Sequence, residues 1–157
     1  MAADIVDSAT RSRIMSGIRG RNTKPELLLR SALHRQGFRF RLHRRDLPGR
    51  PDMVFPKHRA VIFVNGCFWH GHDCPLFRWP KSREDFWRGK ITRNIERDRS
   101  QIAQLRAGGW RVGLVWECAV KGRGKLPLET VTGTCAEWLE SGRTEMDIHG
   151  NQTRPSG

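Results

Sequence analysis

The sequence predicts an α/β domain in which a mixed β-sheet is flanked by helices. Helical and strand-like segments follow one another in the order helix, helix, three strands, long helix, strand, helix. Several strand-like segments are almost wholly apolar, which is typical of a sheet covered on both faces. A length of 157 residues with 37% hydrophobic residues fits one domain with its own core.

The first two expected elements are helices. Residues 9–20 can form a short basic helix, and residues 23–37 can form a second helix with an apolar face. Thr23 is the expected N-cap of the second helix, and Glu26 follows it at the spacing of a capping box. Gly37 is a plausible C-cap, so the helix is expected to end there.

Three strands are expected next. Residues 38–42 alternate between apolar and polar side chains, which is typical of a half-buried strand. A Pro-Gly turn separates this segment from a second strand candidate at residues 52–55. Residues 60–64 are apolar throughout and predict a third strand, whose apolar pattern is typical of a sheet covered on both faces.

The second half of the chain contains a long helix, a strand, a final helix and a flexible tail, expected at residues 82–105, 110–116, 127–140 and 142–157. Ser82 is the expected cap of the long helix, and the Gly108–Gly109 pair is expected to end it. One domain therefore covers residues 1–141, and residues 1–20 form a basic segment at its start.

The charge of the chain points to a polyanionic partner. Lys and Arg number 29 against 16 Asp and Glu, a formal net charge of +13. Such a surface suits nucleic acid, although high solubility is an alternative explanation and charge does not separate DNA from RNA. The longest apolar run, residues 60–64, is too short to span a membrane. The N-terminus does not resemble a secretion signal, so a cytoplasmic location is expected.

Cysteine and histidine spacing predicts a metal site. Cys67, His72 and Cys74 lie within eight residues in a loop, and Cys118 follows the strand at 110–116. Four such ligands suit tetrahedral zinc and leave no open position, so the site is expected to be structural. The alternative is a set of unrelated buried thiols and a surface histidine. Cys135 falls in the last helix and is expected in the core.

Two acids and a histidine are candidates for chemistry. Asp52 follows a turn at a strand start, where it can hold a hard divalent cation or be an ordinary turn carboxylate. His70 can be a zinc ligand or a general base. Asp98 shares the helical phase of the apolar residues Ile95 and Ile102, so it needs a partner on the buried face. That partner is either a catalytic histidine or an arginine.

Phe68 and Trp69 form a pair of large aromatic residues in the same polar loop. Filling the core is the usual role of such residues. The functional alternative is a wedge between base pairs, where apolar side chains unstack and kink a duplex.

These residues lie in motifs that resemble the very short patch repair (Vsr) endonucleases over residues 8–140. Several of these motifs are specific, and they include Leu-Pro-Gly-Arg-Pro-Asp at 47–52 and Gly-Cys-Phe-Trp-His at 66–70. The others lie at residues 10–12, 61–63, 94–99, 109–112 and 115–118. The resemblance implies a restriction-endonuclease-like core of the PD-(D/E)xK type. It also implies nicking of DNA 5′ to the T of a T:G mismatch left by deamination of 5-methylcytosine.

The resemblance also implies roles for individual residues. Asp52 and the backbone carbonyl of Val64 would bind catalytic Mg²⁺, and His70 would activate the attacking water with support from Asp98. Glu26 matches an acid near the active site, beside its capping-box interpretation. Structural Zn²⁺ would be bound by Cys67, His72, Cys74 and Cys118. DNA contacts would be made by Met15, Phe68, Trp69, Lys90 and Asn94.

The chain departs from the patterns it resembles at a few positions. The strand at 60–64 lacks the acid and lysine of the usual restriction-nuclease core, as do the Vsr endonucleases. Val64 replaces a threonine of the best-known member, and Asn65 and Gly71 replace histidines. The sequence context read around the mismatch is therefore left open.

The implied partners are double-stranded DNA with a T:G mismatch, mismatch-repair proteins and a repair polymerase. A monomer at the bacterial nucleoid, without membrane attachment, is expected. Three alternatives remain: a restriction-type endonuclease of fully paired DNA, a non-catalytic zinc-stabilised DNA-binding module, and an RNA-binding protein.

Overall fold

The computed structural model describes residues 24–75 and 77–151. The expected helix at residues 9–20, the cap Thr23 and the DNA-contact candidate Met15 lie outside these ranges. Within them, a sheet has the spatial order β1-β2-β3-β4-β5, which is also the order along the chain. Its strands are β1 Arg41–Leu42, β2 Met53–Phe55, β3 Ala60–Asn65, β4 Arg111–Trp116 and β5 Glu145–Ile148.

The sheet is mixed, as the sequence predicts. Strands β1, β2 and β3 pair antiparallel, whereas β4 pairs parallel with both β3 and β5. Parallel neighbours need long crossover connections. Helix α3, Glu84–Ala107, lies in the connection from β3 to β4, and helix α5, Leu128–Glu140, lies in the connection from β4 to β5.

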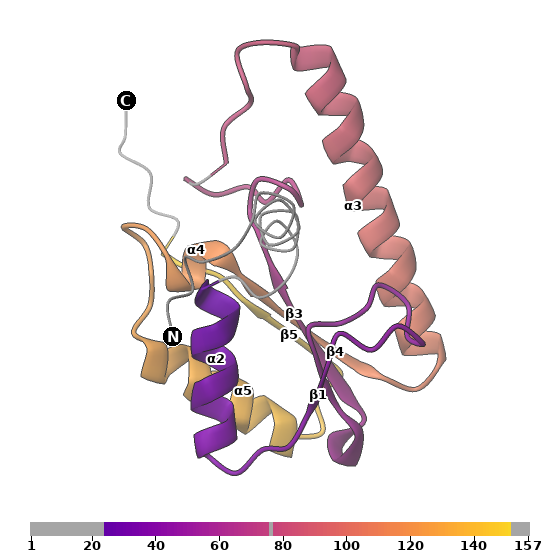
Figure 1. Cartoon of the computed structure of the whole chain (residues 1–157), viewed down its shortest axis with the longest axis vertical. Helices are drawn as coiled ribbons and strands as arrows, with labels where there is room; N and C mark the ends of the chain where they lie inside the picture. The colour runs from indigo at the N-terminus through magenta and orange to yellow at the C-terminus, as the bar shows by residue number, and fades with distance from the viewer. Residues whose placement is uncertain (1–23, 76, 152–157) are drawn as a thin grey trace, which may run out of the picture.

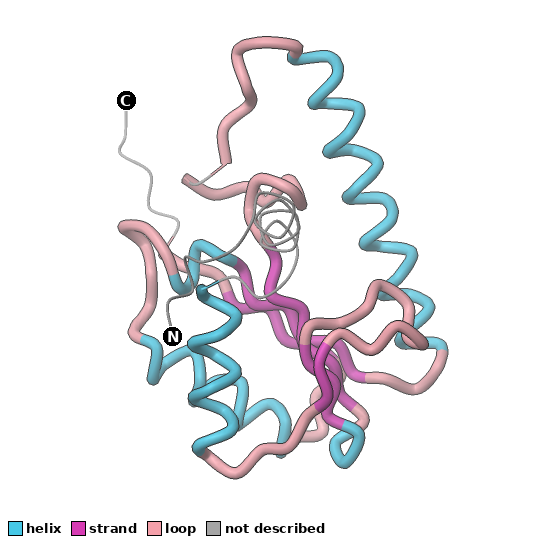
Figure 2. The backbone as a smooth tube through the Cα atoms, in the orientation of Figure 1, coloured by secondary structure: helices cyan, strands magenta, loops and turns pink. Residues whose placement is uncertain are grey.

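Helices cover both faces of the sheet (Figure 1). Helix α2, Lys24–Arg35, packs with α5 on one face, around a core that includes Phe55 and Trp138. Helix α3 covers the other face, where Val61 and Leu105 belong to a smaller core. The tube view shows that the N-terminal end of α3 extends beyond the sheet, where the loop that follows β3 joins it (Figure 2).

Strand β3 has a simple physical basis. Ile62 belongs to the core on the α2–α5 face, and its neighbour Val61 belongs to the core on the α3 face. Because successive side chains of a strand point to opposite faces, a strand covered on both sides must be apolar at every position. The apolar run at residues 60–64 is the third strand that the sequence predicts, and the structure places it at the centre of the sheet.

Three expectations about boundaries are wrong. Ser82 does not cap α3: Arg83 is the N-cap residue, in a left-handed conformation and without a side-chain cap hydrogen bond. The strand expected at 38–42 is reduced to β1, because only Arg41 and Leu42 pair with β2. The expected flexible tail includes β5, since Glu145–Ile148 pairs with β4 and Ile148 is buried.

The structure also contains two short elements that the sequence did not predict. A 3₁₀ turn, η1, spans Pro56–His58, and helix α4 spans Glu117–Val120 directly after β4. Helix α4 places Cys118 and Ala119 inside the fold at the end of the sheet. No helix in the described ranges is long and apolar enough to cross a bilayer.

Candidate active site and metal centre

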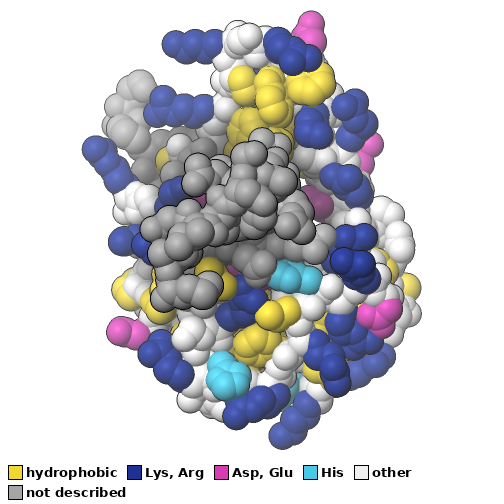
Figure 3. All heavy atoms as spheres, viewed as in Figure 1, with side chains coloured by type: hydrophobic (Ala, Val, Ile, Leu, Met, Phe, Trp, Pro, Cys, Tyr) yellow, Lys and Arg dark blue, Asp and Glu magenta, His cyan; other side chains and the backbone are white. Residues whose placement is uncertain are grey.

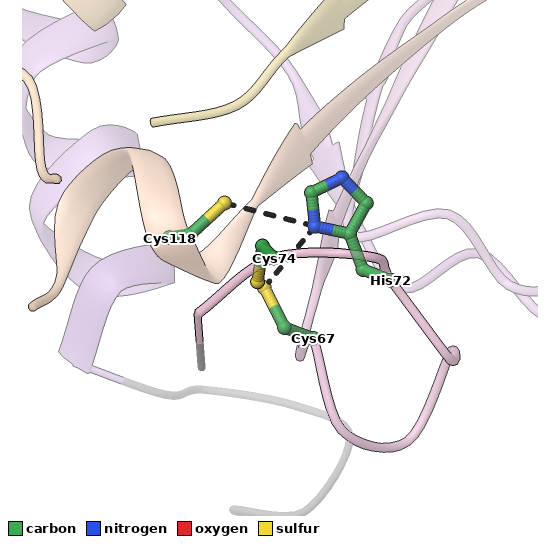
Figure 4. Close-up of side chains that lie close together, drawn as sticks. All are labelled: Cys67, His72, Cys74 and Cys118. Atoms are coloured by element: carbon green, nitrogen blue, oxygen red, sulfur yellow. Dashed lines mark hydrogen bonds between the residues drawn. The ribbon is translucent and has the colours of Figure 1, made fainter. Parts of the chain in front are cut away.

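Three cysteines and one histidine meet at the end of the sheet. Cys67, His72 and Cys74 come from the loop after β3, and Cys118 comes from α4 (Figure 4). Nδ1 of His72 lies 3.6 Å from Sγ of Cys67 and 3.7 Å from Sγ of Cys118. One ligand atom from each residue lies within 4.8 Å of all the others.

This arrangement fits a tetrahedral metal ion. Zn–S and Zn–N bonds of ordinary length place sulfur and nitrogen about 3.6 Å apart across a tetrahedron. Burial lowers the pKa of His72, which favours the neutral imidazole that a metal requires. Burial also raises the pKa of the thiols of Cys67 and Cys118, so these thiols need a metal or another cation to lose their protons. Cys135 lies apart in the core, where burial raises its pKa to about 12.

Neighbouring groups hold the cysteine–histidine cluster in place. The backbone N–H of Cys67 donates a hydrogen bond to Oε1 of Glu117 at 3.3 Å. The backbone N–H of Gly150 donates to Sγ of Cys118 at 3.4 Å, so the segment after β5 reaches the cluster. The ring of His72 stacks on Trp116. Sequence reasoning missed these supports, and two of them depend on backbone groups that leave no trace in residue types.

A cavity of about 1260 Å³ lies beside the cysteine–histidine cluster, since Gly66, Phe68 and Glu117, which are chain neighbours of its cysteines, line the cavity. Asp52, Val64, His70 and Asp98 all line it, although they come from four separate places in the chain. Its wall also carries basic side chains: Lys24, Arg45, Arg50, Arg97, Lys121 and Lys125. Positive charge around carboxylates suits a ligand that is itself anionic, such as a phosphodiester.

Asp52 is nearly buried at the entrance to β2. Only 5% of the residue is exposed, and its Oδ2 accepts a hydrogen bond of 2.6 Å from the backbone N–H of Val64. The second carboxylate oxygen, Oδ1, is turned toward His43 at 3.4 Å. The two residues assigned to a cation by resemblance, Asp52 and Val64, are therefore adjacent across strands β2 and β3.

His70 pairs with Asp98. Nδ1 of the imidazole lies 2.5 Å from Oδ2 of the carboxylate, which comes from the middle of α3. The partner of Asp98 is thus the histidine of the first alternative and not an arginine. His70 lies outside the cysteine–histidine cluster, whose imidazole belongs to His72. Because Nδ1 faces the carboxylate, Nε2 is left for a reacting group.

His43, a residue that the sequence analysis did not single out, lies between the carboxylates of Glu26 and Asp52. Nε2 of His43 lies 2.9 Å from Oε2 of Glu26 and 3.4 Å from Oδ1 of Asp52. The pKa of His43 is raised, chiefly by hydrogen-bonding attraction to Asp52, while burial opposes the shift. Glu26 is 1% exposed and also lies 3.5 Å from Arg30. A lone histidine in an arginine-rich segment carried no signal that could have revealed this group.

Phe68 and Trp69, in the loop between β3 and α3 that also carries Cys67, His72 and Cys74 (the metal loop), extend toward α3. Phe68 and Trp69 contact each other edge to face, with ring centroids 5.1 Å apart, and both contact Trp87 of α3. Nδ2 of Asn94 donates a hydrogen bond of 2.9 Å to the backbone carbonyl of Trp69. Both aromatic residues are half-buried, which leaves part of each ring accessible.

The remaining DNA-contact candidate in the described ranges is Lys90. It is half-buried on α3, one turn before Asn94. Lys and Arg side chains are spread widely over the face of the molecule shown in Figure 3. The structure therefore brings Phe68, Trp69 and Asn94 together between α3 and the loop that follows β3, and Lys90 lies one helical turn from Asn94.

Comparison with known proteins gives consistent matches. The sequence profile of the family described as DNA mismatch endonuclease Vsr matches residues 3–76. DNA mismatch endonuclease Vsr of Escherichia coli (strain K12) is 48% identical over 150 residues, which cover 94% of this chain and 96% of that protein. The type II nicking enzyme V.XorIIP of Xanthomonas oryzae pv. oryzae is 51% identical over 78% of this chain and 90% of its own length. V.NmeAIP of Neisseria meningitidis, another type II nicking enzyme, is 44% identical over 76% and 86%.

Proposed function

The chain belongs to the Vsr family of DNA mismatch endonucleases, and we propose that it nicks one strand of duplex DNA 5′ to the T of a T:G mismatch. Such mismatches arise when 5-methylcytosine deaminates, and the nick would start very short patch repair. One observation carries the proposal: the His70–Asp98 pair and the buried Asp52 line the same cavity, whose wall carries basic side chains.

The carboxylate of Asp52 and the backbone carbonyl of Val64 are the proposed Mg²⁺ ligands. Both residues line the cavity, and hard oxygen donors are the ligands that Mg²⁺ prefers. When bound, the cation would stabilise the negative charge that develops on the scissile phosphate. A structural Zn²⁺ is proposed for the cysteine–histidine cluster, whose spacing fits tetrahedral ligation.

His70 is the proposed general base. Its Nε2 would take a proton from the attacking water, while Asp98 holds the ring by Nδ1 and stabilises the imidazolium that forms. The carboxylate belongs to a 24-residue helix, so the ring is oriented by a rigid element and not by the loop alone. With Asp52 as the cation ligand and His70 as the base, the proposed mechanism needs no acid or lysine on β3, and β3 contains neither.

The proposed DNA interface combines a general grip with local recognition. The net charge of +13 would supply contacts to phosphates that do not depend on sequence. Phe68 and Trp69 would insert beside the mismatch, together with Met15, which lies outside the described ranges. Lys90 and Asn94 would contact the mismatched bases, and Asn94 would at the same time hold the backbone of Trp69.

The test is a nicking assay on duplexes that differ at one base pair. A T:G duplex and the matching T:A duplex, each with randomised flanks, are incubated with the protein with and without Mg²⁺. We expect a single nick in the T strand of the T:G duplex only, dependent on Mg²⁺ and lost in Asp52→Asn. Equal cutting of the T:A duplex would favour a restriction-type enzyme. Binding without any nicking would favour a non-catalytic DNA-binding module.

The randomised flanks also yield the sequence context around the mismatch. Competition with single-stranded RNA tests the RNA-binding alternative, which predicts that RNA displaces the T:G duplex. The same proposal places the protein at the bacterial chromosome, as a monomer that hands the nick to a repair polymerase.

A further inference from the structure

His43 has no role in the mechanism proposed above, yet its ring lies between the carboxylates of Glu26 and Asp52, and Asp52 lines the cavity. We propose that Nε2 of His43 is a protein ligand of the cation bound by Asp52, with Glu26 as a further ligand, and that this nitrogen shifts the cation preference toward Mn²⁺. The inference rests on the proposed function, because it assigns an additional ligand to the proposed catalytic cation.

The distances between the three donor atoms fit one octahedral ion. Nε2 of His43 lies 2.9 Å from Oε2 of Glu26 and 3.4 Å from Oδ1 of Asp52. Metal–ligand bonds of ordinary length place neighbouring corners of an octahedron about 3.0 Å apart. One ligand atom from each of the three residues lies within 4.8 Å of the others.

The donor atoms of Asp52, Glu26 and His43 are oriented by neighbouring groups and shielded from solvent. Oδ2 of Asp52 accepts a hydrogen bond from the N–H of Val64, so Oδ1 remains the oxygen that faces His43. Oε2 of Glu26 and Nε2 of His43 are both shielded from solvent. A cation that reaches this pocket therefore meets ligands whose water shell has already been removed, so it gains more from each contact.

The backbone places His43 where it can act as a ligand. The residue follows β1, and its N–H donates a hydrogen bond of 3.4 Å to the carbonyl of Asp52. It also has a φ of 47°, a left-handed conformation that costs free energy for a residue with a side chain. Such strain is often found at functional sites, because the surrounding structure must hold the residue in place.

The donor set decides the cation preference. Mg²⁺ strongly favours oxygen ligands, whereas an imidazole nitrogen suits first-row transition metals, and carboxylates accept Mn²⁺ readily. A site with one nitrogen and two carboxylates therefore discriminates less against Mn²⁺ than a site built from oxygen alone. Removing the nitrogen should weaken Mn²⁺ binding more than Mg²⁺ binding.

The alternative role of His43 is that of a positive countercharge between two buried carboxylates. The two roles predict opposite effects of removing the ring. Without a ligand, a cation binds less tightly. Without a competing positive charge, a cation binds more tightly, because both carboxylates are then free to attract it.

The experiment measures Mn²⁺ binding to the full-length, zinc-loaded protein without DNA, by the loss of the electron paramagnetic resonance signal of free Mn²⁺. Competition with Mg²⁺ gives the Mg²⁺ affinity in the same samples. We expect His43→Ala to weaken Mn²⁺ binding at least about tenfold and to weaken Mg²⁺ binding less. His43→Gln retains a side-chain oxygen, so we expect it to keep Mg²⁺ binding and lose the preference for Mn²⁺. His34→Ala, at an exposed position on α2, is the matched control.

Two results would be decisive against this assignment. Unchanged or tighter Mn²⁺ binding in both His43 variants would show that the ring is a countercharge or a bystander, and would leave the proposed nuclease intact. Unchanged Mn²⁺ binding in Asp52→Asn would instead contradict the catalytic cation itself. The failure of the further inference and the failure of the proposed function are therefore distinguishable.

Discussion

The imidazole of His72 stacks on the indole of Trp116, with ring centroids 4.1 Å apart and an angle of 9° between the planes. The same indole meets the ring of His70 edge-on, at 6.2 Å between centroids. One side chain at the end of β4 therefore contacts both the histidine of the metal cluster and the proposed general base. The rings of His72 and His70 are therefore positioned against the same indole.

Trp116→Ala should accordingly affect metal retention and catalysis together. Loss of the stacked surface frees the ring of His72, and loss of comparable support around a metal lowers affinity about 10- to 100-fold. Zinc content after a timed challenge with a chelator measures metal retention, and the nicking rate measures catalysis. Trp116→Phe keeps a flat ring and should retain most of both properties. If Trp116→Ala keeps its zinc and its rate, the shared surface has no functional importance.

His70→Ala should lower the nicking rate about 10²- to 10⁴-fold, the usual effect of removing a general base. Asp98→Asn should lower kcat less, because the ring remains but is held by a neutral amide. Zinc content and binding of the T:G duplex should be unchanged in both variants. Asp85→Asn removes an exposed carboxylate from the same helix and is the matched control. Loss of zinc in His70→Ala would contradict the assignment of His70.

Trp69→Ala should weaken binding to the T:G duplex much more than binding to fully paired DNA. Stacking of one base on an aromatic ring contributes about 1–3 kcal/mol, and only a distorted site gains it. Titration of both duplexes under the same salt conditions gives the two affinities. Trp69→Phe should lie between the wild type and the alanine variant. Equal losses on both duplexes would mean that Trp69 serves only to pack the loop.

Thiol reactivity should report the state of the metal cluster. In the zinc-loaded protein no thiol should react quickly with an aromatic disulfide reagent. After chelation three of the four cysteines should react: Cys67, Cys74 and Cys118. Cys135 should react only in denaturant, because it lies in the core on the α2–α5 face, which does not depend on the ion, whereas the other three cysteines lie in the cluster that the ion would hold. In Cys135→Ala the count after chelation should still be three; a count of two would contradict this assignment.

Two glycine substitutions should change stability in opposite directions. Gly71 has a φ of +60°, and an added Cβ would lie 2.6 Å from Cδ1 of Ile95. Gly71→Ala should therefore destabilise the protein by about 1–3 kcal/mol, through strain and overpacking against α3. Gly133→Ala is the control: it lies in α5 with open space around it, and should stabilise by about 0.5–1 kcal/mol. Denaturant titration of both variants gives the two signs, and equal signs would contradict the close packing of Gly71.

Features with a clear periodicity or spacing could be predicted from the sequence. The position of Asp98 in the apolar phase of its helix indicated a partnered carboxylate, and its partner is His70. The spacing of Cys67, His72, Cys74 and Cys118 indicated a cluster that the fold brings together. In both cases the information lies within a few turns of helix or within one loop and the strand beside it.

Features that depend on contacts between distant segments were missed. Residues 145–148 contain two acids and only two apolar residues, and they become a strand because β4 offers an unpaired edge. His43 lies beside Asp52 only because β1 pairs with β2, and the two residues are nine positions apart in the sequence. The left-handed conformation of Arg83 replaced the expected cap at Ser82, and no local pattern indicates it.

Helix α3 carries two anchor points for consecutive residues of the metal loop. Asn94 holds the backbone of Trp69, and Asp98 holds the ring of His70, four residues further along the helix. Four residues correspond to about 6 Å of helical rise. Under the proposed roles, Trp69 would insert beside the mismatched base pair, and His70 would activate the water that attacks the scissile phosphate. The helix would then act as a ruler, and the offset between lesion and nick would be set by helical pitch, a quantity that loop motion cannot change.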